Sequence, residues 1–192
     1  MTGRTHDLAA ISALGLVFLA SSPSNISLST LLLAVLANQI GGITPDIDQP
    51  TAPFWRNLPI GGIFGKIIGK MLGGHRFLTH SLLGLGLFSV LINLLLHFLH
   101  PIMKNVDIRL VWWAFMIGMV SHLIMDTFTK EGVPWLLPIP VKFGFPPIKA
   151  LRITTGKKIE AMLFFGLLGF DIWYVWAHYT QLVLLLHEHL IR

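Results

Sequence analysis

Three short polar segments interrupt an otherwise apolar chain, at residues 45–48, 75–80 and 121–126. Between them they hold three Asp and three His, namely Asp46, Asp48, His75, His80, His122 and Asp126. Carboxylates and imidazoles are the usual protein ligands of zinc and of other divalent metals. Because ionisable side chains in or beside a membrane segment are costly, they mark a functional site by default. The three segments therefore predict a metal centre.

Two of these segments place a pair of candidate ligands at a defined spacing. Asp46 and Asp48 lie two residues apart in Pro-Asp-Ile-Asp-Gln-Pro, and an extended turn points both carboxylates to one side, where a cation would offset their repulsion. The alternative is a helix-ending cap beside a turn. His122 and Asp126 lie four residues apart and share one helix face. They are either two metal ligands or a hydrogen-bonded pair that holds two helices together.

The segment at 75–80 supplies two imidazoles and a guanidinium. We expect His80 to be a metal ligand. His75 is a candidate for a ligand, for a partner that orients a ligand, or for a general acid or base. Arg76 is suited to binding a phosphate or a developing oxyanion.

Two further residues are candidates because of where they stand. His6 begins the first apolar segment and is either a metal ligand or an interfacial residue. Glu160 begins the last apolar segment. It is a candidate ligand or general base, and a helix-start Glu stabilised by the helix dipole explains it almost as well.

The composition predicts an integral membrane protein. Of the 192 residues, 54% are hydrophobic and only 12% are charged, against about 25% charged in soluble domains; the mean hydropathy is +0.71. The absence of cysteine excludes thiolate zinc sites and disulfides. The basic residues are spread along loops without a nucleic-acid motif, so no nucleic-acid partner is expected.

The apolar pattern predicts a single integral-membrane domain, residues 1–192, that is an all-α polytopic helical bundle. About five membrane helices are expected, over residues 8–20, 28–43, 81–100, 110–128 and 159–186. The first two are short and form either full spans or a re-entrant hairpin. Two long loops, 49–74 and 131–158, separate the others. Within the first loop, the apolar stretch 60–72 with Lys66 and Lys70 is expected to lie flat on the membrane surface.

The distribution of basic residues predicts the orientation. If the N-terminus is cytoplasmic and all five segments cross, both long loops are cytoplasmic and most of the 14 basic residues lie on that side. Only Lys104, Arg109 and Arg192 remain on the other side, which satisfies the positive-inside rule. The same layout, drawn from Lys and Arg alone, brings all the candidate ligands to the cytoplasmic face of the membrane.

The polar segments resemble those of the YdjM-like family, through the stretches 45–50, 74–81 and 121–127 and a Gly-Val-Pro at 132–134. The matches run in order from His6 to Glu160. Members of that family are described as LexA-regulated, inner-membrane-associated bacterial proteins and as predicted metal-dependent hydrolases. The family usually has His where this chain has Gln49, a departure that affects that position as a ligand and not the two Asp. The His-x3-Asp pair is also distantly similar to one in all-helical zinc phospholipase C and single-strand nuclease enzymes.

The residues and the resemblance together imply a metal-dependent, phosphoesterase-like hydrolase at the cytoplasmic membrane face. One or two divalent ions, zinc or manganese, would be held by His6, Asp46, Asp48, His80, His122 and Asp126. Arg76 would bind the anionic substrate, and His75 or Glu160 would move protons. Membrane lipids are the expected partners and a phospholipid or another amphipathic phosphoester the expected substrate. The alternatives are a divalent-cation or proton transporter and a membrane scaffold.

Overall fold

The computed structural model describes residues 1–21, 26–73, 76–139 and 141–190, so that His75 lies outside the described residues. The described residues form eight α-helices joined by turns and short 3-10 helices, which confirms the all-α prediction. The helices are α1 (Gly3–Ser21), α2 (Leu28–Ile43), α3 (Pro53–Arg56), α4 (Gly61–Met71), α5 (Leu82–Leu99), α6 (Ile108–Thr127), α7 (Lys158–Ala177) and α8 (Tyr179–Leu190).

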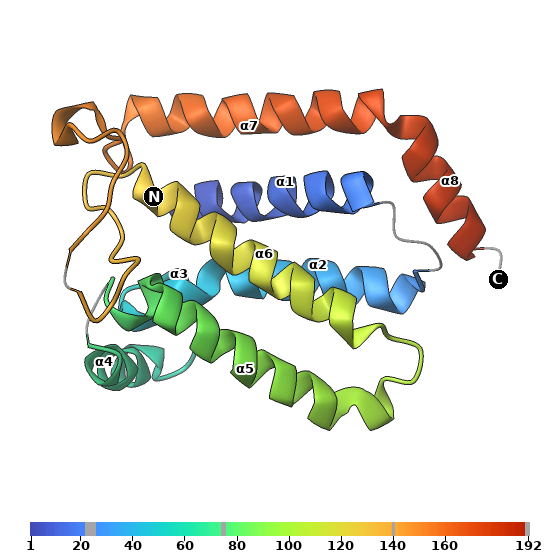
Figure 1. Ribbon diagram of the computed structural model, residues 1–192, viewed down its shortest axis with the longest axis horizontal. Coiled ribbons are helices and arrows are strands. Elements are labelled where there is room, and N and C mark those ends of the chain that lie inside the picture. Colours follow the sequence, from blue (N-terminus) through green and yellow to red (C-terminus); the bar gives the residue numbers. More distant parts are fainter. Residues whose placement is uncertain (22–25, 74–75, 140, 191–192) are drawn as a thin grey trace.

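Four segments of the described chain are long and apolar enough to cross a membrane: Leu28–Asp48, Leu82–Ile102, Ile108–Thr127 and Lys158–Ala177. They correspond to α2 with the turn after it, α5, α6 and α7. The first predicted segment forms α1, which begins earlier than expected and includes Arg4 and Asp7. It is not one of the four candidate spans, although it lies between α2 and α7 in the bundle (Figure 1). The bundle is therefore confirmed, with four candidate spans where about five were expected.

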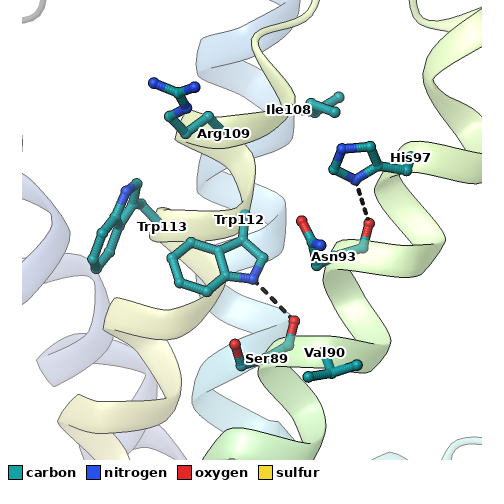
Figure 2. Close-up of a pocket in the computed structure, with 8 residues that line it drawn as sticks. All are labelled: Ser89, Val90, Asn93, His97, Ile108, Arg109, Trp112 and Trp113. Carbon is teal, nitrogen blue, oxygen red and sulfur yellow. Dashed lines mark hydrogen bonds between the residues drawn. The ribbon is translucent and has the colours of Figure 1, made fainter.

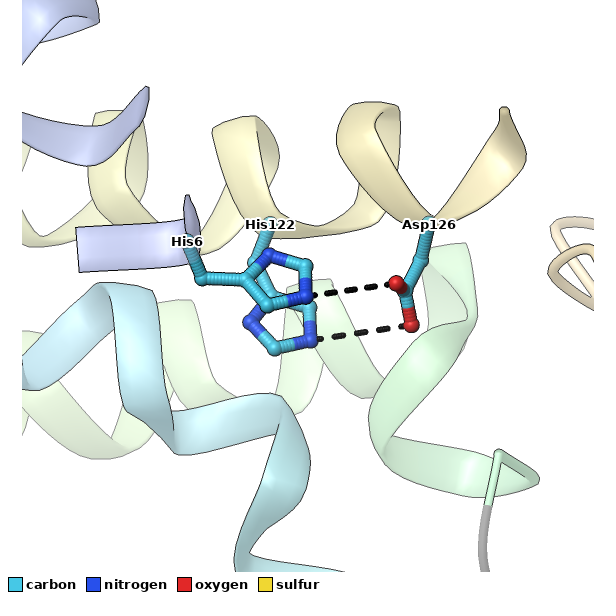
Figure 3. A group of neighbouring side chains, drawn as sticks. All are labelled: His6, His122 and Asp126. Atoms are coloured by element: carbon cyan, nitrogen blue, oxygen red, sulfur yellow. Dashed lines mark ion pairs between the residues drawn. The ribbon is translucent and has the colours of Figure 1, made fainter. Parts of the chain in front are cut away.

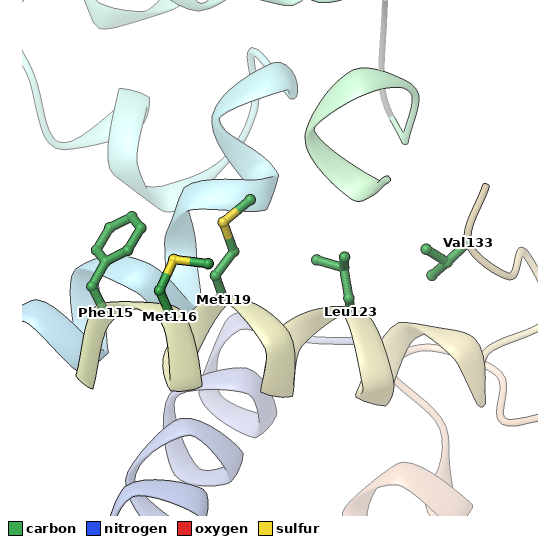
Figure 4. Close-up of a cluster of buried hydrophobic side chains, with 5 residues drawn as sticks. All are labelled: Phe115, Met116, Met119, Leu123 and Val133. Carbon is green, nitrogen blue, oxygen red and sulfur yellow. The ribbon is translucent and has the colours of Figure 1, made fainter. Parts of the chain in front are cut away.

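Helix α6 is the centre of the bundle and packs against α1, α2 and α5 (Figure 1). Half of its span is buried inside the protein, against 6% of the α7 span. The main hydrophobic cluster follows one side of α6 and continues into the loop after it (Figure 4). Its buried members are Phe115, Met116, Met119, Leu123 and Val133. The outer helices thus leave their apolar side chains for lipid, as a membrane bundle requires.

Glycines allow α2 and α6 to approach until their backbones touch. A Cβ on Gly118 would lie 2.0 Å from the carbonyl oxygen of Asn38, and one on Gly41 would lie 2.1 Å from that of Phe115. Asn38, fully buried between the two helices, donates its side-chain amide to the carbonyl of Ala114 at 3.1 Å. Small residues and interhelical hydrogen bonds of this kind are what hold helices together in a membrane.

The last apolar segment is not the single long helix that 159–186 predicts. Helix α7 ends at Ala177, and His178 has φ −109° and ψ 16°, outside the helical range. Its backbone N–H still donates to the carbonyl of Tyr174 at 3.0 Å. Helix α8 then continues in a different direction from the axis of α7 (Figure 1). The hydropathy of the segment is continuous across this break, which is why the sequence pattern did not locate it.

Helix α4 has a glycine side and an apolar side. A Cβ on Gly65 would lie 2.9 Å from Pro50 Cα, and one on Gly69 would lie 2.4 Å from the carbonyl oxygen of Asp48, so this side fits directly against the chain that precedes the helix. The other side exposes the large apolar residues Ile63, Phe64, Ile67 and Met71. An exposed apolar helix side of this size is typical of a helix that lies in a membrane interface, as the sequence predicts for 60–72.

We expect Gly118→Ala to lower the free energy of unfolding by about 1–3 kcal/mol, because the added methyl group meets backbone atoms that cannot rotate away. Gly86 is the matched control, since a Cβ there meets nothing within 4 Å. Gly86→Ala should be neutral or slightly stabilising. Unfolding of both variants in mild detergent measures the difference, and equal stabilities would contradict the α2–α6 contact.

Candidate metal centre

Five of the predicted ligands converge at one end of the bundle. They come from four separate places in the chain: His6 from the start of α1, Asp46 from the turn after α2, His80 from just before α5, and His122 and Asp126 from the end of α6. Within the described residues they form two overlapping groups, His6–His122–Asp126 and Asp46–His80–His122. In each group the candidate ligand atoms all lie within 4.8 Å of one another.

The separations between these atoms suit a shared ion. His6 Nε2 lies 3.2 Å from Asp126 Oδ1, and His122 Nε2 lies 3.8 Å from Asp126 Oδ2 (Figure 3). On its other side, His122 Nε2 is 3.6 Å from Asp46 Oδ1, which is 3.9 Å from His80 Nε2. Four ligands at about 2.1 Å from one tetrahedral ion are themselves about 3.4 Å apart. The arrangement therefore needs little movement to bind a metal.

His122 is the residue that both groups share, and its orientation is set by backbone. Its Nδ1–H donates to the carbonyl oxygen of Gly42 on α2 at 2.6 Å, which leaves Nε2 directed at the carboxylates. A hydrogen bond of this kind fixes the ring of a metal-binding histidine. The ring of His6 stacks on that of His122 with centroids 3.6 Å apart and planes 7° from parallel (Figure 3).

Both imidazoles are buried without full hydrogen bonding. Each is 1% exposed. Among the described residues, neither ring nitrogen of His6 has a hydrogen-bond partner, and the same holds for His122 Nε2. Buried polar atoms in that state are uncommon in native proteins and call for a physical reason. A bound cation would satisfy the Nε2 atoms of both rings, so the donor set fits a metal.

Arg76 does not stand where an anion-binding residue was expected. Its guanidinium is buried and lies 2.5 Å from Asp126 Oδ2, and it donates to Thr129 Oγ1 at 2.8 Å. The Met1 amino nitrogen is 2.6 Å from the other oxygen of Asp126. Asp126 is therefore the point on which the positive charges of this end of the bundle converge. The contact of Arg76 is with a candidate ligand, which it orients and partly neutralises.

Asp48 is not in either ligand group, and the expectation that it points with Asp46 was wrong. Thr44–Asp48 is a 3-10 helix, not an extended turn, and at about three residues per turn two residues two apart face different ways. The Oδ2 atom of Asp48 accepts hydrogen bonds from the backbone N–H of Arg76 at 2.9 Å and from the hydroxyl of Thr79. It also lies 3.5 Å from His80 Nδ1. Its role in the structure is to position His80 and the backbone beside it.

The protonation of His80 follows from these neighbours. The ring is fully buried. Burial by itself lowers the pKa of His80, but the side chains of Asp126 and Asp48 raise it more, and the net result is a pKa above the ordinary value. The ring thus holds a proton well while no ion is bound. Because a metal must displace that proton, metal affinity is expected to fall as the pH falls.

Glu160 is not placed as a ligand or a base. Its Oε1 atom accepts from the backbone N–H of Thr2 at 2.6 Å, from the Thr2 hydroxyl at 2.7 Å and from the Thr5 hydroxyl at 2.8 Å. Its Oε2 atom accepts from the backbone N–H of Gly156 at 2.6 Å. The carboxylate joins the start of α7 to the start of α1, where Thr5 is the residue before His6. Nothing in the sequence around Thr2 and Thr5 predicts this contact, because they meet Glu160 only in the folded chain.

A pocket of about 330 Å³ opens beside the candidate ligands. His6 and Asp46 form part of its wall, together with the carboxylate of Asp7. Phe54 of α3 and Leu58 of the turn after it also line the pocket. The pocket was not predicted, because its wall residues have no distinctive spacing and meet only through the folding of the 49–60 segment. The pocket gives a small molecule access from outside the bundle to the candidate metal ligands.

Comparison with known proteins matches the chain to one family. The family model described as YdjM inner membrane protein matches residues 1–187. An uncharacterised Bacillus subtilis protein, YvsG, is 29% identical over 167 residues, which cover 87% of this chain and 89% of that protein. The inner membrane protein YdjM of Escherichia coli is 28% identical over 136 residues, covering 68% of this chain and 61% of the relative. No solved structure matches the chain.

These relatives and the four apolar spans agree with the predicted location in the bacterial inner membrane. The cytoplasmic position of the N-terminus stays a prediction. None of the matched relatives carries a name that states an activity.

If Glu160 is a structural anchor, Glu160→Gln should lower the free energy of unfolding by about 1–3 kcal/mol, because the amide NH2 must face a hydrogen-bond donor. Hydrogen exchange at Thr5 and His6 should rise with it. Glu131→Gln is the control, since the Glu131 side chain is 63% exposed and its ion pair with the buried Arg76 Nε is long, at 3.5 Å, so the effect on stability should be small. Unchanged stability and exchange in Glu160→Gln would instead favour a chemical role.

Proposed function

The chain belongs to the YdjM inner membrane protein family, and from this premise we propose that it is a membrane-bound metal-dependent hydrolase. Its substrate would be a phospholipid or another amphipathic phosphoester, cleaved at the cytoplasmic membrane face. One observation carries the proposal: His6, His122 and Asp126 are buried together. The Nε2 atoms of both imidazoles face the Asp126 carboxylate and have no hydrogen-bond partner among the described residues. A scaffold that only locks helices together would satisfy those atoms internally.

The ligands of the ion would be His6, Asp46, His80, His122 and Asp126. Two overlapping groups that share His122 are compatible with one or with two ions, and the mixed nitrogen and carboxylate set suits zinc or manganese. When bound, the metal lowers the pKa of a coordinated water to near neutrality and polarises a phosphoryl oxygen. The chain's own contribution is to hold the imidazoles rigidly, through Gly42 for His122 and through Asp48 for His80.

Glu160 is not suited to the proton transfer that the sequence suggested for it. The two proton carriers expected from the sequence are His75 and Glu160, and both carboxylate oxygens of Glu160 are occupied by hydrogen bonds. His75 lies outside the described residues, and its role stays a prediction from the sequence. Arg76 pairs with Asp126 and orients it, so it is not proposed to bind the substrate phosphate.

The amphipathic character of the substrate is supported by what surrounds the site. The pocket beside His6 and Asp46 is walled by Phe54 and Leu58 as well as by polar groups, so it suits a molecule with a polar ester and an apolar tail. Helix α4 follows this wall in the chain and exposes its apolar side. A site at the ends of membrane helices, next to such a helix, lies where lipid headgroups are found.

The first test is the metal content of the purified protein. We expect one or two equivalents of zinc or manganese by mass spectrometry of the elements, and loss of the ion in His122→Ala and in Asp46→Ala. His97→Ala is the control, since His97 lies near the other end of α5. Among the described residues, its ring forms a hydrogen bond with the backbone carbonyl of Asn93 in the same helix. Full metal retention in both site variants would overturn the proposal.

The second test is metal-dependent turnover of a phospholipid in proteoliposomes. Chelation should abolish release of the headgroup product, and Asp46→Ala should do the same. Asp48→Asn should retain the ligands but lower metal affinity or turnover by about 10- to 100-fold, since it loosens the support of His80. Phe54→Ala should act mainly on KM. Metal flux across the vesicle wall without any lipid turnover would favour a transporter and contradict the hydrolase.

A further inference from the structure

A second polar site lies at the other end of the bundle, in a groove between α5 and α6. The groove has a volume of about 580 Å³. Its wall is formed by polar side chains of α5 and by basic and aromatic side chains of α6 (Figure 2). These are Ser89, Asn93 and His97 on the first helix and Arg109, Trp112 and Trp113 on the second. None of them takes part in the candidate metal centre, which lies before α5 and at the far end of α6.

The polar residues of α5 form a stripe along a membrane-spanning helix. Ser89, Asn93 and His97 recur every four residues, so they share one face. That face belongs to the most apolar span of the described chain, Leu82–Ile102, of which only 11% is buried within the protein. At a rise of about 1.5 Å per residue, Asn93 lies roughly 13 Å along the helix from Ile102. An exposed amide at that depth is inside a hydrocarbon core about 30 Å thick.

The stripe has little hydrogen bonding of its own. In the described part of the chain, the Asn93 side chain and the Ser89 hydroxyl form no hydrogen bond, and Ser89 contributes only its backbone carbonyl, which accepts from Trp112 Nε1 at 3.0 Å (Figure 2). His97 Nδ1–H donates to the carbonyl of Asn93 at 2.8 Å, which leaves Nε2 open to the groove. Polar groups on a lipid-facing helix need a polar partner, and these three side chains can each still form a hydrogen bond with a bound molecule.

The rim of the groove supplies positive charge and interfacial anchors. Arg109 is exposed and, among the described residues, forms no ion pair. The nearest carboxylate in sequence, Asp107, accepts from the backbone N–H groups of Arg109 and Leu110 and so is directed at the helix end. Trp113 is 53% exposed beside the arginine. Tryptophan at this level is typical of the boundary between headgroups and acyl chains.

We propose that this groove binds the phosphate group of an anionic phospholipid, in the leaflet opposite the candidate metal centre. The guanidinium of Arg109 would pair with the phosphate, which arginine recognises with two parallel hydrogen bonds. Asn93 would donate to a glycerol or ester oxygen of the same lipid, below its phosphate. Trp112 and Trp113 would flank the upper part of the lipid.

A lipid fits the groove better than a second copy of the chain does. A symmetric contact through this face would bring Arg109 close to its own copy without an acidic residue in the groove to pair with it. A free phosphate ion would use Arg109 and would leave the Asn93 side chain without a partner.

The test is lipid retention by the full chain, measured by native mass spectrometry after purification with phosphatidylglycerol or with phosphatidylcholine. We expect one phosphatidylglycerol to remain bound, with an affinity about tenfold higher than in Arg109→Ala, the size expected for losing a charge-assisted hydrogen bond. Arg109→Lys should be intermediate, and Asn93→Leu should also weaken binding. Lys104→Ala is the matched control, since Lys104 is a basic residue in the α5–α6 connection that does not line the groove.

Each other outcome overturns the assignment. Equal retention of the two lipids would exclude selection of an anionic headgroup at this groove. Equal retention of phosphatidylglycerol by Arg109→Ala and wild type, when both have the same melting temperature, would exclude phosphate recognition by Arg109. Displacement of the lipid by millimolar inorganic phosphate would show a free-anion site. Dissociation of an oligomer on the Arg109→Ala substitution would show a protein interface. His122→Ala should keep the lipid, so that this result does not depend on the metal centre.

Discussion

The contact that the structure depends on is the backbone-to-backbone approach of α2 and α6. Gly41 and Gly118 remove the side chains that would separate the two helices. One helical turn beyond Gly118, His122 then reaches across to the carbonyl of Gly42. The same approach carries the α2 chain end into position, so that Asp46 arrives opposite His122 Nε2 at 3.6 Å. The close packing of these two helices thus sets the positions of the candidate ligands at the end of the bundle.

Much of the fold was predictable because hydropathy and helix caps are local. The bounds 28–43 match α2 residue for residue, and 81–100 and 110–128 differ from α5 and α6 by one or two residues. Charge distribution along the loops was enough to bring His6, His80, His122 and the Asp residues to one end, and the structure brings five of the six predicted ligands together. Periodicity and charge sufficed here because each acts over one helix or one loop.

What escaped prediction depends on backbone detail and on contacts between distant segments. Asp48 turned away from Asp46 because the turn is a 3-10 helix, a choice that sequence spacing does not reveal. Glu160 became an anchor through Thr2 and Thr5, more than 150 positions away in the chain. Arg76 found a buried carboxylate in place of an incoming anion. In each case a partner that only the tertiary structure supplies determines what the side chain contacts.

Helix α4 has a mechanical consequence that follows from its glycine side. Because a methyl group at Gly69 would overlap the carbonyl oxygen of Asp48, the helix rests directly on the residue that steadies His80, with no side chain between them to act as a cushion. Its opposite side offers isoleucine, phenylalanine and methionine outward. A force on this apolar side would therefore be passed to Asp48, and through Asp48 to His80, without crossing a flexible side chain. The outer face of α4 and the support of a candidate ligand are in that sense mechanically continuous.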